Sequence, residues 1–209
     1  MERLSYVINS TRTYWRITLP PLFRCIPPEW KSKFIVVISD YKRARIRDIC
    51  GFECHFTTDH SFGWSAVNEV IRLPQRSKYY FFITDTSKIG DSFFELTNYH
   101  EGNDDYEFIC AKDGGQDGLG AWNYDFLMAH TEEIKSMLNC DKEKEVASEY
   151  LLFGKVNKLG RYRNAEKCKK LGYFDTYETG TKRLHWYYVS VDLIKYKANW
   201  GLPERVLVP

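Results

Sequence analysis

Several common sequence signals are missing from this chain of 209 residues, and each absence excludes a class of protein. No run approaches the ~20 apolar residues of a membrane-spanning helix, and the first residues lack the apolar core of a signal peptide. No internal repeat or low-complexity tract is visible. No Gly-x-Gly-x-x-Gly follows the first predicted strand, which disfavours a dinucleotide-binding oxidoreductase. We therefore expect a soluble, cytoplasmic protein without a membrane span.

Charge and cysteine content exclude further classes of protein. Thirty Lys and Arg residues against 28 Asp and Glu leave a formal net charge of +2, so no overall field favours nucleic acid as a partner. The six cysteines lack the paired spacings of a zinc module. Cys50, Cys54 and His55 are close enough to suggest a metal site, but no fourth ligand is visible. We expect reduced, buried thiols instead.

Apolar residues are plentiful, at 44% hydrophobic and 16% aromatic, which predicts one well-packed domain. The first ninety residues alternate apolar strand patterns with helical ones, which predicts an α/β fold with a mostly parallel central sheet flanked by helices. The apolar ending at 205–209 suggests one domain of a longer polypeptide. The predicted strands are 5–9, 34–39, 52–57 and the run before Asp85, and the predicted helices are 14–25, 42–50 and 62–73.

The second half of the sequence has a different pattern of residues. Residues 106–111 predict a strand, and 113–120 form a glycine-rich loop whose backbone can approach a ligand closely. Helical patterns follow at 122–130, 131–138 and 142–159. An aromatic strand at 184–191 contains His185.

Polar residues follow the predicted strands of the first half. Asp40 and Asp85 come directly after two apolar strands, and residues 9–12 end the first one. In open α/β sheets, ligands bind just beyond the carboxyl ends of parallel strands. A carboxylate accepts from a base imide or ribose hydroxyl, and an arginine meets a diphosphate. The alternative is that Asp40 and Asp85 only cap the following helix or turn.

Four segments in this order, 7–12, 35–40, 63–68 and 81–85, resemble the nucleotide-sugar domain of inverting GT-A glycosyltransferases. More narrowly, the chain is similar to glycosyltransferase domains of chlorella-virus proteins that build the capsid glycan. The resemblance implies a single GT-A (Rossmann-like) domain, with a nucleotide-binding half at 1–92 and an acceptor-side half at 93–209. It also implies transfer of a sugar, such as rhamnose, from a UDP-type donor to a hydroxyl of a growing glycan, with inversion favoured and a retaining reaction as the alternative. A viral source would place the protein in the host cytoplasm.

The resemblance assigns the nucleotide site. Thr11, Arg12 and Asp40 correspond to the first-strand loop and the acid that hold the nucleoside. Asn68 matches the polar residue of the family's Gly-x-Ser-x-x-Asn pattern. Asp85 matches a carboxylate that meets the ribose and the metal on the diphosphate.

The metal site departs from the family pattern. Mn²⁺ or Mg²⁺ is held there by an Asp-x-Asp signature, of which Asp85 remains, because Ser87 occupies the third position. A hydroxyl is a weaker ligand for a hard cation than a carboxylate. The resemblance names His185 as a helper, and Asp91 is a second candidate. The alternatives are a satisfied histidine within an aromatic strand and a solvated loop carboxylate.

The catalytic base is assigned by the same resemblance to Glu149, near the start of a helix. Asp117, in the glycine-rich loop, is the rival base, and Gly115 and Trp122 are candidates for contact with donor or acceptor sugar. The alternatives are a solvated helical carboxylate, a turn aspartate and a core tryptophan. A module that binds nucleotide or glycan without catalysis is the alternative function.

Overall fold

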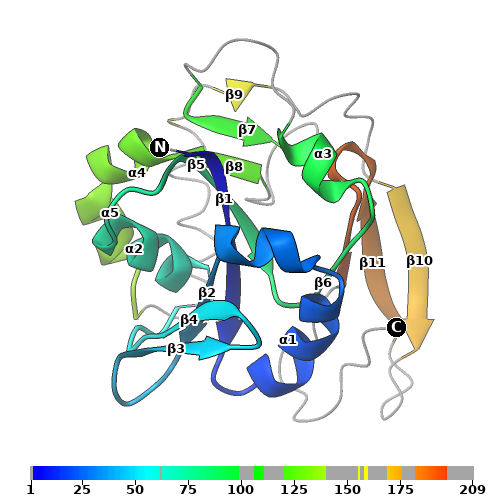
Figure 1. Ribbon diagram of the computed structural model, residues 1–209, viewed down its shortest axis with the longest axis horizontal. Coiled ribbons are helices and arrows are strands. Elements are labelled where there is room, and N and C mark those ends of the chain that lie inside the picture. Colours follow the sequence, from blue (N-terminus) through cyan, green and yellow to red (C-terminus); the bar gives the residue numbers. More distant parts are fainter. Residues whose placement is uncertain are drawn as a thin grey trace.

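The computed structural model describes residues 2–61, 63–98, 106–110, 120–139, 155, 158–159, 169–175 and 182–196. Its centre is an eight-stranded sheet with the strand order β3-β4-β2-β1-β5-β8-β7-β9 (Figure 1). The strands are β1 (Glu2–Thr11), β2 (Phe34–Ser39), β3 (Arg45–Ile49), β4 (Phe52–Phe56), β5 (Ser77–Thr84), β7 (Phe108–Cys110), β8 (Gly120–Asn123) and β9 (Lys158–Leu159).

Parallel pairing joins β4, β2, β1 and β5 in the middle of this sheet. β3 pairs antiparallel with β4 at one side, and β8 pairs antiparallel with β5 at the other. This arrangement confirms the predicted α/β class with a mostly parallel central sheet.

Helices cover both faces of the sheet (Figure 1). One face carries α1 (Trp15–Arg24), the 3-10 helix η1 (Pro28–Lys33) and α3 (Phe93–Asn98), and the other carries α2 (Trp64–Arg72), α4 (Tyr124–Ala129) and α5 (Thr131–Ser136). Successive side chains of a strand point to opposite faces, so Tyr6 and Ile8 of β1 join the α1 core while Val7 joins the α2 core. All six residues of β2 are consequently buried, as predicted for a strand covered on both faces.

A second, antiparallel sheet has the order β10-β11-β12-β6. Its elements are β6 (Ser87–Ile89), β10 (Lys169–Asp175), β11 (Lys182–Tyr188) and β12 (Leu193–Tyr196), with the 3-10 helix η2 (Val189–Val191) before β12. Asp192, between η2 and β12, links β11 to the segment that follows β6. Its Oδ2 accepts from the Ser92 backbone N–H at 3.0 Å, and its Oδ1 accepts from the Tyr187 hydroxyl at 2.9 Å. The C-terminal strands therefore pack beside β6, which begins two residues after Asp85.

The expected elements of the first half are confirmed, with one exception. The predicted basic helix at 42–50 is wrong, because this segment forms the edge strand β3, which pairs with β4 as a hairpin. Cys50 and Gly51 make the hairpin turn with φ of 57° and 83°. Exposed basic residues fit a helix or an edge strand equally well, and the turn decides between them.

Two further predictions in the second half need correction. The helix predicted at 122–130 begins later, because Gly120–Asn123 pairs with β5 as strand β8. Asn123 then caps α4, with its Oδ1 accepting from the backbone N–H groups of Asp125 and Phe126. Lys158–Leu159 form β9 rather than the end of a helix, and most of 142–159 and 113–120 lies outside the described residues. The described part contains no helix long and apolar enough to cross a membrane.

Candidate functional site

Four parallel strands end together at one edge of the central sheet. Their registers align Thr11 of β1 with Ser39 of β2, Ile38 with Phe56 of β4, and Asn9 with Thr84 of β5. The residues that follow these positions are therefore neighbours. This edge is where an open α/β sheet binds its ligands.

Backbone hydrogen bonds connect the segments that leave this edge. The Arg12 N–H donates to the Ser39 carbonyl at 3.0 Å, and the Asp85 N–H donates to the Asn9 carbonyl at 3.0 Å. The Asp40 N–H donates to the Asp59 carbonyl at 3.1 Å. The loops after all four strands are thus fixed relative to one another.

The carboxylate of Asp85 is turned toward the start of α1. Its Oδ2 accepts from the Ser10 hydroxyl at 2.5 Å and from the Thr18 hydroxyl at 2.6 Å. Burial raises the pKa of Asp85, and the two hydroxyl bonds and nearby backbone N–H groups oppose that rise. Asp85 therefore joins the end of β5 to β1 and to the first turns of α1.

Asp40 has a left-handed backbone, with φ of 69°, at the point where the chain leaves β2. Aspartate tolerates this conformation better than most residues. Its Oδ1 contacts Nδ1 of His60, a side chain that is 70% exposed. Asp40 thus presents a partly exposed carboxylate at the edge, beside an exposed histidine.

Asn68 lies in α2 and reaches the same edge through Asp59, a residue that the sequence analysis did not identify. The Asn68 Nδ2 donates to Asp59 Oδ2 at 2.8 Å, and Arg72 Nη1 lies 3.3 Å from the same oxygen. Because the Asp59 carbonyl also accepts from the Asp40 N–H, Asn68 helps to position the Asp40 loop.

Polar atoms without hydrogen-bond partners gather near this edge. Within the described part of the chain, they include the buried Thr11 Oγ1, Thr57 Oγ1, Trp64 Nε1 and Asn68 Oδ1. An unsatisfied buried polar atom costs about 1–3 kcal/mol. These buried atoms therefore carry an energetic cost in the folded protein, and each is shielded from the surface.

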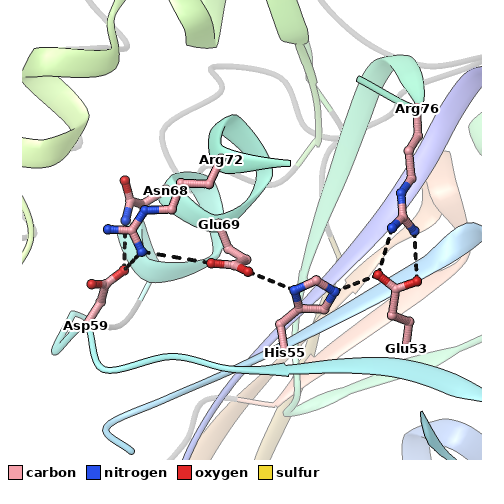
Figure 2. Close-up of polar contacts among 7 residues, drawn as sticks. All are labelled: Glu53, His55, Asp59, Asn68, Glu69, Arg72 and Arg76. Carbon is pink, nitrogen blue, oxygen red and sulfur yellow. Dashed lines mark hydrogen bonds and ion pairs between the residues drawn. The ribbon is translucent and has the colours of Figure 1, made fainter. Parts of the chain in front are cut away.

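A polar network extends from Asp59 along the α2 side of the sheet (Figure 2). His55 is buried, and its Nδ1 lies 2.7 Å from Glu69 Oε1 while its Nε2 lies 2.6 Å from Glu53 Oε1. Arg76 binds both oxygens of Glu53, at 3.1 and 2.7 Å, and Arg72 Nη1 lies 4.0 Å from Glu69 Oε2. The network thus runs from β4 through α2 to the Asp59 loop.

The protonation of His55 follows from this geometry. Burial lowers the pKa of His55, but the hydrogen bonds and charges of Glu69 and Glu53 outweigh it, so the pKa is raised. Both ring nitrogens face carboxylate oxygens, which requires a proton on each for two hydrogen bonds. Sequence reasoning missed this network, and the i, i+2 spacing of Glu53 and His55 on one face of β4 is the part of it that the sequence displays.

The cysteine expectations are confirmed in part. Cys54 is buried, and burial raises the pKa of its thiol to about 12, whereas Cys50 is exposed in the hairpin turn. The Cys50, Cys54 and His55 set does not form a metal site, because both nitrogens of His55 bind carboxylates.

The described residues of the edge do not by themselves fit a divalent cation. No group of three His, Cys, Asp or Glu side chains within the described ranges can hold a metal ion. Asp85 Oδ2 already accepts two hydroxyl bonds. His185 lies in β11, but its side chain is outside the described part, and Asp91 is exposed in the turn after β6. We therefore derive no chemical step through a metal.

The remaining predicted residues divide into two groups. Glu149, Asp117 and Gly115 lie outside the described residues. Trp122 is 5% exposed in β8 and stacks between Phe108 and Phe126, with ring centroids 4.4 and 5.7 Å away. This placement fits the core alternative for Trp122.

Comparisons with known proteins include the following two structural likenesses. No protein-family model and no curated protein matches the sequence. The chain is similar to residues 1–349 of TarS from S. aureus, with 10% identity and a TM-score of 0.44 over 76% of this chain and 59% of that one. It is similar to the apo form of the glycosyltransferase GlyE from Streptococcus pneumoniae TIGR4, with 10% identity and a TM-score of 0.44 over 76% of this chain and 45% of that one. At this identity and TM-score, neither likeness carries an argument about function.

Proposed function

We propose that this protein is a glycosyltransferase that moves a sugar from a UDP-type nucleotide sugar to a hydroxyl of a growing glycan. One observation carries the proposal: four parallel strands end side by side and bring Thr11, Arg12, Asp40 and Asp85 to one edge. Those are the residues predicted to hold a nucleotide. Asn68 joins them through Asp59 and the backbone of Asp40.

The chemical groups at the edge suit a nucleoside diphosphate. Arg12 is exposed and has no carboxylate partner within the described residues, so its guanidinium is available for a phosphate. Asp40 offers a partly exposed carboxylate to a base imide or a ribose hydroxyl.

The transfer itself is a displacement at the anomeric carbon. The acceptor hydroxyl attacks this carbon, a new C–O bond forms, and the bond to the diphosphate oxygen breaks, so the nucleoside diphosphate leaves with the electron pair. The hydroxyl proton passes to a carboxylate base, for which Glu149 and Asp117 are the candidates. Attack opposite the leaving group inverts the configuration. The resemblance to capsid-glycan enzymes favours rhamnose as the sugar and a capsid glycan as the acceptor.

A binding module without catalysis is the second candidate, and the state of Asp85 favours it. This carboxylate is bound by two hydroxyls and its pKa is raised, so it is less available to a cation than a free carboxylate. Both candidate functions predict nucleotide binding, but only the glycosyltransferase predicts turnover of a donor sugar.

Thermal unfolding with UDP, UDP plus Mn²⁺, and UDP-sugars tests the proposal. A ligand at 100 times its Kd stabilises the folded state by about 2.7 kcal/mol, which raises the Tm of a domain of this size by about 5–10 °C. Donor hydrolysis and transfer to glycan acceptors are measured in parallel. No shift with any nucleotide contradicts the proposal, whereas a shift without turnover selects the binding module.

The variant Asp40→Asn tests whether the nucleotide binds at this edge of the sheet. Loss of a hydrogen bond to a charged group costs about 1.5–3 kcal/mol, so the Kd for UDP should rise at least about tenfold. Asp125→Asn, an exposed carboxylate of α4, is the matched control and should leave the Kd unchanged. An equal Kd in Asp40→Asn and the parent protein would place the nucleotide elsewhere.

A further inference from the structure

Positive charge is concentrated in the first part of the chain. Residues 1–50 contain ten Lys and Arg against four Asp and Glu, although the whole chain has a formal net charge of only +2. The remaining residues are therefore net acidic. Such an asymmetry points to an anionic partner for one part of the surface.

Six exposed cations of this part lie along one side of the fold. We call them the basic edge; they are Arg12, Arg16, Lys42, Arg43, Arg45 and Arg47. None of them forms an ion pair with any described residue, whereas Lys33, Arg72 and Arg76 each have a carboxylate partner. The basic edge thus has charge that the described protein does not neutralise.

Aromatic rings fix the positions of several of these guanidinium groups. Arg45 lies over the rings of Tyr41 and Phe56, at 5.2 and 4.6 Å from their centroids. Arg12 lies 5.9 Å from the Tyr41 centroid. Trp15 Nε1 donates to the Tyr41 hydroxyl at 2.8 Å, so the ring itself is held in place. Positioned guanidiniums bind planar anionic groups with less loss of side-chain entropy.

The basic edge continues directly from the candidate site. Arg12 follows β1, and Tyr41 follows Asp40 at the end of β2. From there the cations extend onto the edge strand β3, where Arg45 and Arg47 lie on one face about 7 Å apart. Together with Lys42 and Arg43 before the strand, they can meet successive charged groups of a linear polymer whose end lies at the site.

We propose that the basic edge docks the acceptor of the proposed transferase, and that this acceptor is an anionic glycan with carboxylate or phosphate groups. The proposal rests on the proposed function. Charge complementarity supplies the attraction along β3, and the free hydroxyl at the end of the glycan reaches the sheet edge.

Two other polyanions fit the surface less well. Single-stranded nucleic acid binds by stacking its bases on exposed aromatic rings, but here Tyr41 is half-buried and Phe56 is buried. An anionic lipid surface favours an apolar side chain among the cations. The most exposed large apolar side chain of the described residues, Ile46, alternates with Arg45 and Arg47 and lies on the opposite face of β3.

Binding of polygalacturonate tests the proposal, with neutral dextran, single-stranded DNA and phosphatidylserine vesicles as comparisons. The protein should bind polygalacturonate or a phosphate-bearing polysaccharide at low salt, and the affinity should fall as salt rises. The double variant Arg45→Gln/Arg47→Gln keeps most of each side-chain stem and should bind at least about tenfold more weakly, the equivalent of two charge-assisted contacts. The control Lys88→Gln/Lys135→Gln removes the same charge elsewhere and should bind like the parent protein.

The outcomes separate this proposal from the proposed function. If the control variant weakens glycan binding as much as the basic-edge variant does, docking at the basic edge is refuted. It is also refuted if the protein binds DNA or vesicles more tightly than it binds both anionic glycans. Binding of neither anionic glycan at low salt also overturns it. UDP thermal shifts measured on the same variants should equal those of the parent protein. A UDP shift without glycan binding refutes the docking proposal alone, whereas specific glycan binding without any UDP shift refutes the transferase and leaves a glycan-binding surface.

Discussion

Raising the pH should destabilise this protein through His55. This side chain is 1% exposed and lies between Glu53 and Glu69, which Arg76 and Arg72 contact from the far sides. The folded state raises the pKa of His55 above its ordinary value of 6.5. The stabilisation is therefore fully present below about pH 6.5 and is lost as the pH rises through the pKa of the folded state.

The variant His55→Gln gives the size of this effect. A protonated imidazole donates to both carboxylates, whereas a glutamine amide at this position can replace one donor only. The lost hydrogen bond to a charged group is worth about 1.5–3 kcal/mol at pH 6. A neutral imidazole also has one donor, so at high pH the parent protein and the variant should differ by less than about 1 kcal/mol.

Urea unfolding followed by tryptophan fluorescence measures the difference in unfolding free energy between His55→Gln and the parent protein at a series of pH values between about 5.5 and 9. His130→Gln is the control, because His130 is partly exposed and does not lie between two close carboxylates of the described residues: its Nδ1 contacts the Phe126 carbonyl at 2.9 Å, and its Nε2 lies 4.0 Å from Glu133 Oε2. The difference in unfolding free energy between His130→Gln and the parent protein should not shrink with rising pH as that of His55→Gln does. A difference for His55→Gln that stays constant or grows with pH would show that folding does not favour the protonated imidazole.

Three other predictions concern single positions. Asp85→Asn retains an acceptor for the two hydroxyls, so its Tm should stay close to that of the parent protein, while Asp85→Ala should lower the Tm by several degrees; equal losses would show that the charge itself is needed for folding. Gly120→Ala should cost at least about 2 kcal/mol in urea unfolding, because φ is 152° and a Cβ would lie 2.1 Å from the Ile109 carbonyl oxygen; an unchanged unfolding curve would contradict this geometry. A thiol reagent at pH 8 should label Cys50 quickly and Cys54 only on unfolding, which mass spectrometry of peptides can check; rapid labelling of Cys54 in the folded protein would be inconsistent with its burial.

The central strands were predictable from sequence because their burial leaves a direct signal. Residues 34–39 are a continuous β-branched and apolar run, and the structure buries all six. The polar residue after such a strand then falls at the carboxyl edge by topology alone. That is why Asp40 and Asp85 could be placed together before any coordinates.

The network around His55 was not predictable in the same way. His55 contacts Glu69 across fourteen positions of sequence, and only the packing of α2 on β4 brings the two together. The hairpin partner β3 was also misassigned, since the five residues of Arg45–Ile49 are exposed or only partly buried and have no core-facing apolar pattern. Asp85 directly follows a central strand, as expected from the sequence, but its bonds to Ser10 and Thr18 depend on the packing of α1.

A crystal structure of the protein soaked with a UDP-sugar would show where the nucleotide binds. We expect the nucleotide at the carboxyl ends of β1, β2 and β5, with the base or ribose at Asp40 and the diphosphate within reach of Arg12. Nucleotide bound at another surface, or an empty edge at a UDP-sugar concentration that raises the Tm, would contradict this expectation.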